Sequence, residues 1–401
     1  MTRTSLPPVV DWPAAAEIAG RLAPPGPRAS RGELQDLVGG LREAAGDATE
    51  HVLATTRMTP AGGVRRVAGG PRDGAAQLGS VLVVDRARWA LANTEVMASM
   101  TEPLAAALDD AGSAPSQTSR MGGAVEVGGL LAVLAPRVLG QFDPYARLAL
   151  PTPPDPSDPA HVPGAPARPA SHDESGGAGR LLLVAPNMLH AERAMGVTPH
   201  DFRLWVCLHE QTHALQFAAA PWLAEHLRGR VGGLLQDITR TALDLSRAPL
   251  LDKVAAVGRG VADVVTGPFR EGGRAPFERM LSPAQKDEMA EITAVMALLE
   301  GHADVMMDAV GPRVVPTVRQ IRARFDKRRD GEGAPRLDLV LRRLLGMDAK
   351  LAQYRDGVSF VRAVEREVGR DGLNAVWTSV QALPTAREIA DPRAWVRRVH
   401  G

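Results

Sequence analysis

The 401-residue sequence has very little cysteine and almost no net charge. Its single cysteine, Cys207, excludes an internal disulfide and is typical of a reducing compartment. The 47 Lys and Arg residues balance 46 Asp and Glu residues, so no overall field favours nucleic acid or an anionic membrane. We expect the one basic run, residues 322–329, to be a solvated helix end, and we expect no nucleic-acid partner.

A long uninterrupted hydrophobic run is also absent. The best stretch, residues 125–139, is broken by Glu126 and Arg137, so no transmembrane helix is predicted. Residues 1–12 contain prolines and an acid where a signal peptide needs an apolar run. We therefore expect a cytoplasmic protein that has no membrane partner.

The most informative motif that is present is His209-Glu210-Gln211-Thr212-His213. Two histidines four residues apart lie on one face of a helix, where neutral ring nitrogens of both can bind one metal ion. This HExxH pattern is the zinc-protease motif, in which the glutamate takes a proton from the water that the metal activates. We predict one Zn²⁺ bound by His209 and His213, with Glu210 as general base.

The residues around the motif predict a helix. Thr198 is a candidate N-cap, Pro199 suits the first helical position, and Asp201 can reach back to the cap. The predicted helix runs from about 199 to 219 and closes before Pro221. The alternative interpretation is an ordinary amphipathic helix on which the two histidines form a polar stripe.

A catalytic zinc site needs a third protein ligand and an open fourth position. The metzincin continuation is excluded, because it requires Gly and His where this sequence has Gln216 and Ala219. The best candidate is Glu300, on a predicted helix that begins with the capping box Ser282-Pro283-Ala284-Gln285 and ends near 309. Glu300 borders an apolar stripe, and a metal ion is one of the few partners that makes a buried carboxylate tolerable.

The spacing of Glu300 and Asp304 resembles that of thermolysin-like zinc proteases, the gluzincin arrangement. This resemblance implies that Glu300 is the third ligand and that Asp304, one turn later, accepts a hydrogen bond from His209 or His213. The intervening segment, residues 214–299, is much longer than in thermolysin, so an insertion must fill it.

The residues leave alternatives open for two roles. Glu300 can instead form a surface salt bridge while His302 is the third ligand, and Glu225 and His226 are weaker rivals. For a donor that stabilises the oxyanion, the candidates are Tyr354 and His302. Each also has a purely structural interpretation. Tyr354 can be a helix residue whose hydroxyl is hydrogen-bonded to the backbone, and His302 a core histidine whose ring nitrogens have hydrogen-bond partners.

Further short motifs occur along most of the sequence. They lie at residues 83–86, 140–144, 183–187, 205–213, 221–223, 300–303, 353–357 and 391–395. Together they resemble the zincin-like metallopeptidase type 2 family, whose members are often labelled as associated with coenzyme F420 biosynthesis. The resemblance implies a zincin fold and a peptidase, whereas nothing in these residues indicates deazaflavin chemistry.

The expected fold is mainly α with a small β-sheet and an HExxH active-site helix. We expect residues 1–150 to form a mostly helical part with one or more strands, 151–179 a flexible Pro- and Gly-rich loop, and 180–401 the zincin-like catalytic part, possibly continuous with the first. In zincins an edge strand beside the active-site helix pairs with the substrate. Residues 181–184 are a candidate for that edge strand or for an interior strand of the same sheet.

The function predicted from the sequence is zinc-dependent hydrolysis of a peptide bond in a peptide or protein substrate. Two alternatives belong to other classes. One is a non-catalytic zinc-binding module of zincin fold, which the HExxH glutamate disfavours because a structural site has no use for a general base. The other is a hydrolase acting on a non-peptide amide in coenzyme F420-related metabolism.

Overall fold

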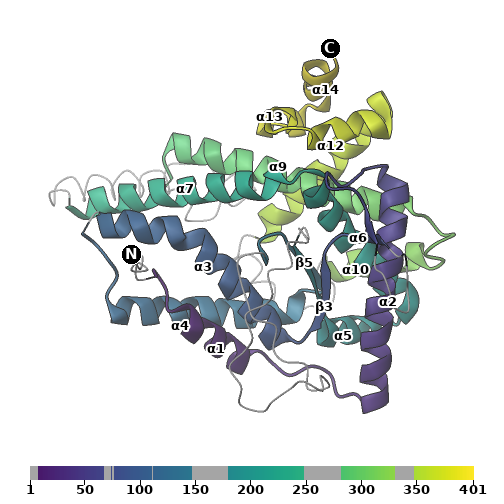
Figure 1. The fold of residues 1–401 in the computed structure, drawn as a ribbon, viewed down its shortest axis with the longest axis horizontal. Helices are drawn as coiled ribbons and strands as arrows, with labels where there is room; N and C mark the ends of the chain where they lie inside the picture. Colours follow the sequence, from purple (N-terminus) through teal and green to yellow (C-terminus); the bar gives the residue numbers. More distant parts are fainter. Residues whose placement is uncertain are drawn as a thin grey trace.

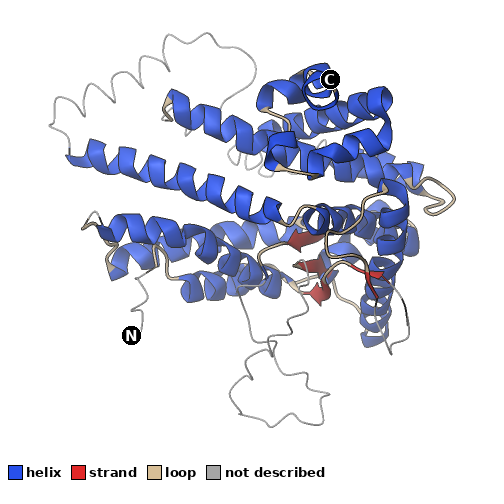
Figure 2. Cartoon of the chain, turned by 45° about the horizontal axis from the view of Figure 1, so that its top comes forward, coloured by secondary structure: helices blue, strands red, loops and turns tan. Residues whose placement is uncertain are grey.

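The computed structural model describes residues 8–66, 74, 76–110, 112–146, 179–247, 281–329 and 347–401. These residues form many helices around a small sheet, which confirms the predicted fold class (Figure 1 and Figure 2). The segment predicted to be a flexible loop, 151–179, lies outside the described residues except for Gly179. No described helix is long and apolar enough to cross a membrane.

The main sheet has three strands in the order β3-β5-β4. β3 (Ser80–Val84) pairs in parallel with β5 (Arg180–Val184), and β4 (Gly140–Asp143) pairs antiparallel with the other side of β5. β5 is therefore interior, and all five of its residues are buried. Of the two positions considered for residues 181–184, the interior one is correct, and β4 forms the edge on that side among the described residues. A separate two-stranded ribbon joins β1 (Arg65–Arg66) to β2 (Ala76–Gln77).

Helices pack on both faces of this sheet. The alternating side chains of β5 show the two layers, because Leu181 and Leu183 belong to the large core and Leu182 and Val184 to a smaller one. The large core lies against α2 (Arg31–Thr56), α5 (Ala185–Met195), α6 (Pro199–Ala219), α9 (Pro283–Ala309), α12 (Met347–Leu373) and α14 (Pro392–His400). The smaller core lies against α1 (Trp12–Leu22), α3 (Arg86–Asp110) and α4 (Gln117–Leu134).

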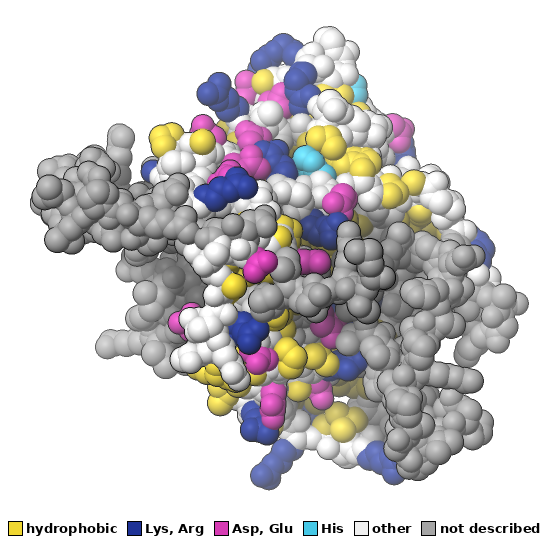
Figure 3. Space-filling model, turned by 60° about the vertical axis from the view of Figure 1, so that its left-hand side comes forward, with side chains coloured by type: hydrophobic (Ala, Val, Ile, Leu, Met, Phe, Trp, Pro, Cys, Tyr) yellow, Lys and Arg dark blue, Asp and Glu magenta, His cyan; other side chains and the backbone are white. Residues whose placement is uncertain are grey.

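The remaining elements lie around these layers, and several of them add buried residues to the large core. They are the helices α7 (Trp222–Arg247), α10 (Val318–Arg329) and α13 (Ala386–Ala390) and the short 3₁₀ turns η1 (Ala135–Arg137), η4 (Asn374–Trp377) and η5 (Val380–Ala382). α7 and α9 run side by side away from the sheet (Figure 1). On the face drawn in Figure 3, basic and acidic side chains are interspersed.

The two helices that carry the predicted site have the predicted bounds, and Ser282 and Thr198 lie at their N-cap positions as predicted. At α9, the Ser282 hydroxyl accepts from the Gln285 N–H at 3.2 Å and the Gln285 side chain accepts from the Ser282 N–H at 2.9 Å, which completes the capping box. At α6, Thr198 makes no side-chain cap. The Asp201 carboxylate accepts instead from the N–H and hydroxyl of Thr317, at 2.9 and 2.7 Å, and so ties the start of α6 to the segment before α10.

A cluster of ion pairs holds the last residue of β4, Asp143, against β5 and α3. Arg180 on β5 donates to Asp143 on β4 at 3.0 Å and to Glu95 on α3 at 3.1 Å. Burial raises the pKa of both carboxyls, and Arg180 opposes that rise. The guanidinium therefore stabilises the charged form of two carboxyls, which burial disfavours.

We expect Arg180→Met to lower the free energy of unfolding by about 3–5 kcal/mol at neutral pH, because it leaves the buried Asp143 carboxylate and the partly buried Glu95 carboxylate without their cation. Without the guanidinium their folded-state pKa values rise further above the unfolded values. The folded state then binds more protons, so stability falls as the pH rises through the raised pKa values and returns as the pH is lowered.

Urea unfolding at pH 5 and pH 8 measures this, and the loss should be smaller at pH 5. The control is Arg21→Met, which removes an exposed ion pair with Glu17 and should change little. A loss that is equal at both pH values, or larger at pH 5, would contradict the interpretation.

Candidate metal centre

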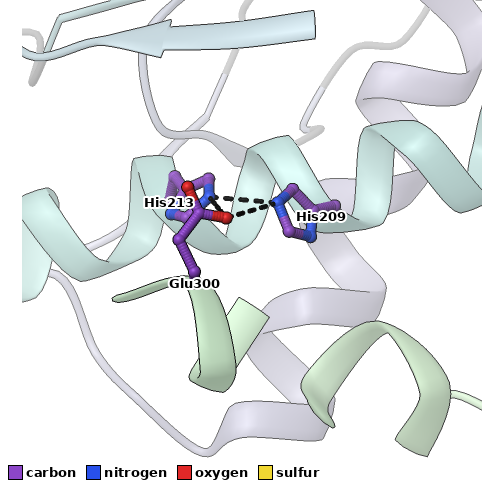
Figure 4. Close-up of side chains that lie close together, drawn as sticks. All are labelled: His209, His213 and Glu300. Carbon is purple, nitrogen blue, oxygen red and sulfur yellow. Dashed lines mark hydrogen bonds and ion pairs between the residues drawn. The ribbon is translucent and has the colours of Figure 1, made fainter. Parts of the chain in front are cut away.

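His209 and His213 on α6 and Glu300 on α9 turn their polar atoms toward one point (Figure 4). The two histidine Nε2 atoms are 3.2 Å apart, and Glu300 Oε2 lies 3.4 Å from His209 Nε2 and 3.8 Å from His213 Nε2. Among the described residues, this is the only group of three or more His, Cys, Asp or Glu side chains whose ligand atoms lie within 4.8 Å of one another. The structure thus brings together the three residues that the sequence predicted as ligands.

The spacing of these atoms fits a zinc ion. Zn–N and Zn–O bonds of about 2.0–2.2 Å at tetrahedral angles place ligand atoms about 3.3–3.6 Å apart. The three distances found, 3.2, 3.4 and 3.8 Å, scatter around that range. Each side chain keeps between 14 and 21% of its surface exposed, so the three groups are largely but not fully enclosed. Two imidazoles and one carboxylate are the donor set typical of catalytic zinc sites, whereas structural sites usually have four protein ligands.

The charges in the site couple the three groups. Burial disfavours the Glu300 carboxylate, but hydrogen bonds from both histidines outweigh it and hold the pKa of Glu300 well below its ordinary value. Burial likewise disfavours a charged His213, but Glu300 outweighs it and raises the pKa of His213 to about 9 in the metal-free chain. A proton therefore occupies the site at neutral pH when no metal is present, and metal binding must release it.

Glu210 lies on the sheet side of α6, against β4. Only 8% of its surface is exposed, and burial raises its pKa despite the nearby histidines and the backbone N–H of Phe142. A Cβ atom at Gly140 would stand 2.7 Å from Glu210 Cγ and 2.9 Å from Cδ, so a larger residue there would displace this carboxyl from its position. The raised pKa suits a group that accepts and returns a proton near neutral pH.

Gln216, one turn after His213, is a site residue that the sequence did not predict. Its Oε1 lies 2.9 Å from His213 Nδ1, while its Nε2 lies 2.9 Å from both the Leu299 carbonyl oxygen and His302 Nδ1. The three-residue spacing on one helix face was the only available signal.

Asp304 does not have the role that the thermolysin-like spacing implied for His213. Its carboxylate accepts from Arg322 on α10 at 2.8 Å, and Gln216 occupies the Nδ1 side of His213. The physical reason is the direction of the side chain, because Asp304 faces α10 and pairs with the nearest cation there. Arg322 also pairs with Asp308 at 2.7 Å and covers the Trp205 ring, so the basic run is not wholly solvated as expected.

The other candidates lie apart from the three ligand atoms or outside the description. His302 is fully buried behind Gln216 with its ring against Trp377, and burial lowers its pKa to about 3, so it is neutral and is not a member of the ligand group. Glu225 pairs with Arg228. His226 is likewise not a member of the group. The side chain of Tyr354 on α12 lies outside the described residues.

Glu300 owes its position to a close crossing of α9 and α12. A Cβ atom at Gly301 would stand 2.2 Å from the Gly357 carbonyl carbon, and a Cβ at Gly357 would stand 1.9 Å from the Ala297 carbonyl oxygen. Both clashes involve backbone, which cannot yield as a flexible side chain does. Two motifs that are separate in the sequence, 300–303 and 353–357, thus meet directly beside the third ligand.

We expect Gly357→Ala to separate these helices, because the added methyl group must displace the backbone of α9. Overpacking of this kind costs about 1–3 kcal/mol, and the shift of α9 should also weaken zinc binding. Urea unfolding and a zinc titration measure the two effects. The control is Gly39→Ala in α2, where nothing lies within 4 Å and the helix should gain up to about 1 kcal/mol. Unchanged stability and affinity in Gly357→Ala would contradict the assigned role of the crossing.

Comparison with known proteins places the chain in a family. No curated protein matches the chain. One solved structure is similar over 98% of this chain and 99% of its own, with 26% sequence identity and a TM-score of 0.57; it is a candidate hydrolase with a novel fold from Chloroflexus aurantiacus. The sequence also matches the zincin-like metallopeptidase family over residues 10–396, nearly its whole length. The chain therefore belongs to the zincin-like metallopeptidase family.

Proposed function

We propose that this protein is a zinc-dependent metallopeptidase that hydrolyses peptide bonds with Glu210 as its general base. Its family is one of zincin-like metallopeptidases, which indicates a metal-dependent hydrolase. The observation that carries the finer proposal is the pairing of an open His209, His213 and Glu300 donor set with a buried glutamate of raised pKa between the two histidines in sequence. A binding module has no need for such a glutamate, whose burial is costly.

His209, His213 and Glu300 would hold the ion, and three protein ligands would leave its fourth position for water and the substrate carbonyl. When bound, zinc acts as a Lewis acid that polarises that carbonyl and lowers the pKa of a coordinated water toward neutrality. Glu210 accepts the proton of the attacking water at its carboxylate and passes it to the nitrogen of the departing amine. Burial assists the first transfer because it raises the proton affinity of the Glu210 carboxylate.

The edge strand β4 offers a place for an extended peptide. The Val184 N–H donates to the Leu139 carbonyl at 2.9 Å, and in an antiparallel ladder the hydrogen-bonded direction alternates along the strand. Gly140 and Phe142 therefore direct their backbone groups away from β5, toward the side where Glu210 lies, and the Phe142 N–H already donates to Glu210, so the other outward groups of β4 are the ones left for a peptide. A peptide paired there would run past the general base through backbone contacts, which are indifferent to side-chain identity. We thus propose a peptide or protein segment in extended form as the substrate.

Metal analysis and a chelator-sensitive peptidase assay on the full-length protein test the proposal. We expect one zinc ion per chain and cleavage in a quenched-fluorescent peptide library, with activity lost to a chelator and restored by added zinc. A protein that binds no zinc would refute the metal site. A zinc-loaded protein that cleaves no peptide in the library would refute the peptidase and leave the metal site standing.

A further inference from the structure

We propose that Gln216 is the positioning residue of the zinc site. Its amide oxygen holds the ring proton of His213 on Nδ1, so that the lone pair of Nε2 faces the other two donor atoms. This inference rests on the proposed zinc site and adds to it a residue that binds neither metal nor substrate. It concerns how the histidine is oriented, which the HExxH pattern alone does not specify.

The orientation of the Gln216 amide follows from its partners. A backbone carbonyl oxygen only accepts hydrogen bonds, so the Gln216 atom 2.9 Å from the Leu299 oxygen must be the NH₂ group. The other end, Oε1, then faces His213 Nδ1 at 2.9 Å. An amide oxygen only accepts, so His213 Nδ1 must be the donor and carries a proton. In the neutral imidazole, Nε2 is therefore the unprotonated nitrogen, as a metal ligand requires.

A second contact fixes the same amide. The remaining N–H of Gln216 points to His302 Nδ1 at 2.9 Å, and the His302 ring packs edge-on against Trp377 with 5.2 Å between ring centroids. Gln216 and His302 are both fully buried. Both amide hydrogens and the amide oxygen are thus engaged by groups on α6 and α9, so the side chain cannot rotate without losing at least one buried hydrogen bond.

The position of Gln216 also explains why solvent cannot replace it. Because the residue is fully buried, its removal leaves the Nδ1–H of His213 without an acceptor in an apolar surrounding. The ring can then rotate or change the nitrogen that carries the proton. Partners of this kind on ligand histidines typically contribute about 10–100-fold to metal affinity.

The test compares three variants with wild type. Gln216→Met keeps the length of the side chain but removes the acceptor, whereas Gln216→Glu keeps an oxygen that can accept from His213 and, when protonated, can donate to Leu299. The matched control is Gln211→Met. Gln211 lies on the same helix, is also buried, and donates to the Ala45 carbonyl at 3.1 Å, away from the three ligands.

Zinc affinity is measured by competition with a chromogenic chelator, and Co²⁺ is substituted to record the visible spectrum of the site. We expect Gln216→Met to bind zinc about 10–100-fold more weakly and to change the Co²⁺ spectrum. Gln211→Met should keep both at wild-type values even if it loses stability, and Gln216→Glu should recover most of the affinity. Should Gln216→Met not fold, Gln216→Asn withdraws the acceptor by one methylene and should weaken binding in the same direction.

Two outcomes separate this inference from the proposed function. If wild type binds zinc and Gln216→Met binds it equally well, or Gln211→Met weakens it as much, the positioning role is overturned while the metal site stands. If wild type binds no zinc, both are overturned.

Discussion

Glu210→Gln is expected to abolish peptide hydrolysis while zinc stays bound. The glutamine side chain has nearly the same shape, so it fits the space that Gly140 leaves on β4. It cannot take up the proton of the attacking water, and general acid–base catalysis contributes about 10²–10⁴-fold to the rate. His209, His213 and Glu300 are untouched, so the donor set remains complete. The two measurements are kcat/KM on a peptide that wild type cleaves and zinc content after gel filtration.

Glu225→Gln is the control that separates the loss of the general base from the mere loss of one negative charge. Glu225 is exposed, pairs with Arg228 at the start of α7, and is not a member of the ligand group. Glu225→Gln should therefore leave kcat/KM unchanged. If Glu210→Gln cleaved peptides at the wild-type rate, another group would have to be the base.

Glu300→Ala is expected to remove zinc from the site. Two imidazoles alone leave two tetrahedral positions without a protein ligand and leave the ion's charge without a carboxylate. The loss of affinity should exceed the roughly 10–100-fold effect of removing a partner that only orients a ligand. Equilibrium dialysis against a zinc buffer measures it, and hydrolysis should disappear in parallel.

Asp304→Asn is the matched control for that variant. Asp304 lies one turn later on the same helix but pairs with Arg322, so its neutralisation should weaken the packing of α10 and spare zinc affinity. A 10-fold or larger loss of zinc in Asp304→Asn would favour the role that the sequence resemblance implied for this residue. Retention of zinc by Glu300→Ala would contradict the assignment of the third ligand.

The ligand residues could be predicted from the sequence because each follows from a local pattern. A four-residue spacing places His209 and His213 on one face of α6, and an acid beside an apolar stripe singles out Glu300 on α9. That these helices meet could not be derived locally. It depends on the backbone contact between Gly301 and Gly357, which appears in the sequence only as two glycines in separate motifs.

The residues around the ligands were harder to predict because their partners are distant in sequence or depend on rotamers. Asp304 has a cation from another helix, Arg322, within reach, and spacing along α9 says nothing about it. The contacts of Gln216 depend on the side-chain rotamer that lets its amide reach from α6 to α9. The edge strand β4 was not predicted as a strand, because it has only four residues and includes Gly140 and Asp143, which have low strand propensity.

The placement of the donor atoms on two helices far apart in the chain has a thermodynamic consequence. An unfolded chain separates His213 from Glu300 by residues 214–299 and offers no preformed cage. Zinc at the proposed site would bind the native state in preference to the unfolded one, and its binding energy would add to the stability of the fold by mass action. The midpoint temperature of thermal unfolding should accordingly rise with the free zinc concentration. The fraction of the protein that stays folded then depends on how much zinc is available.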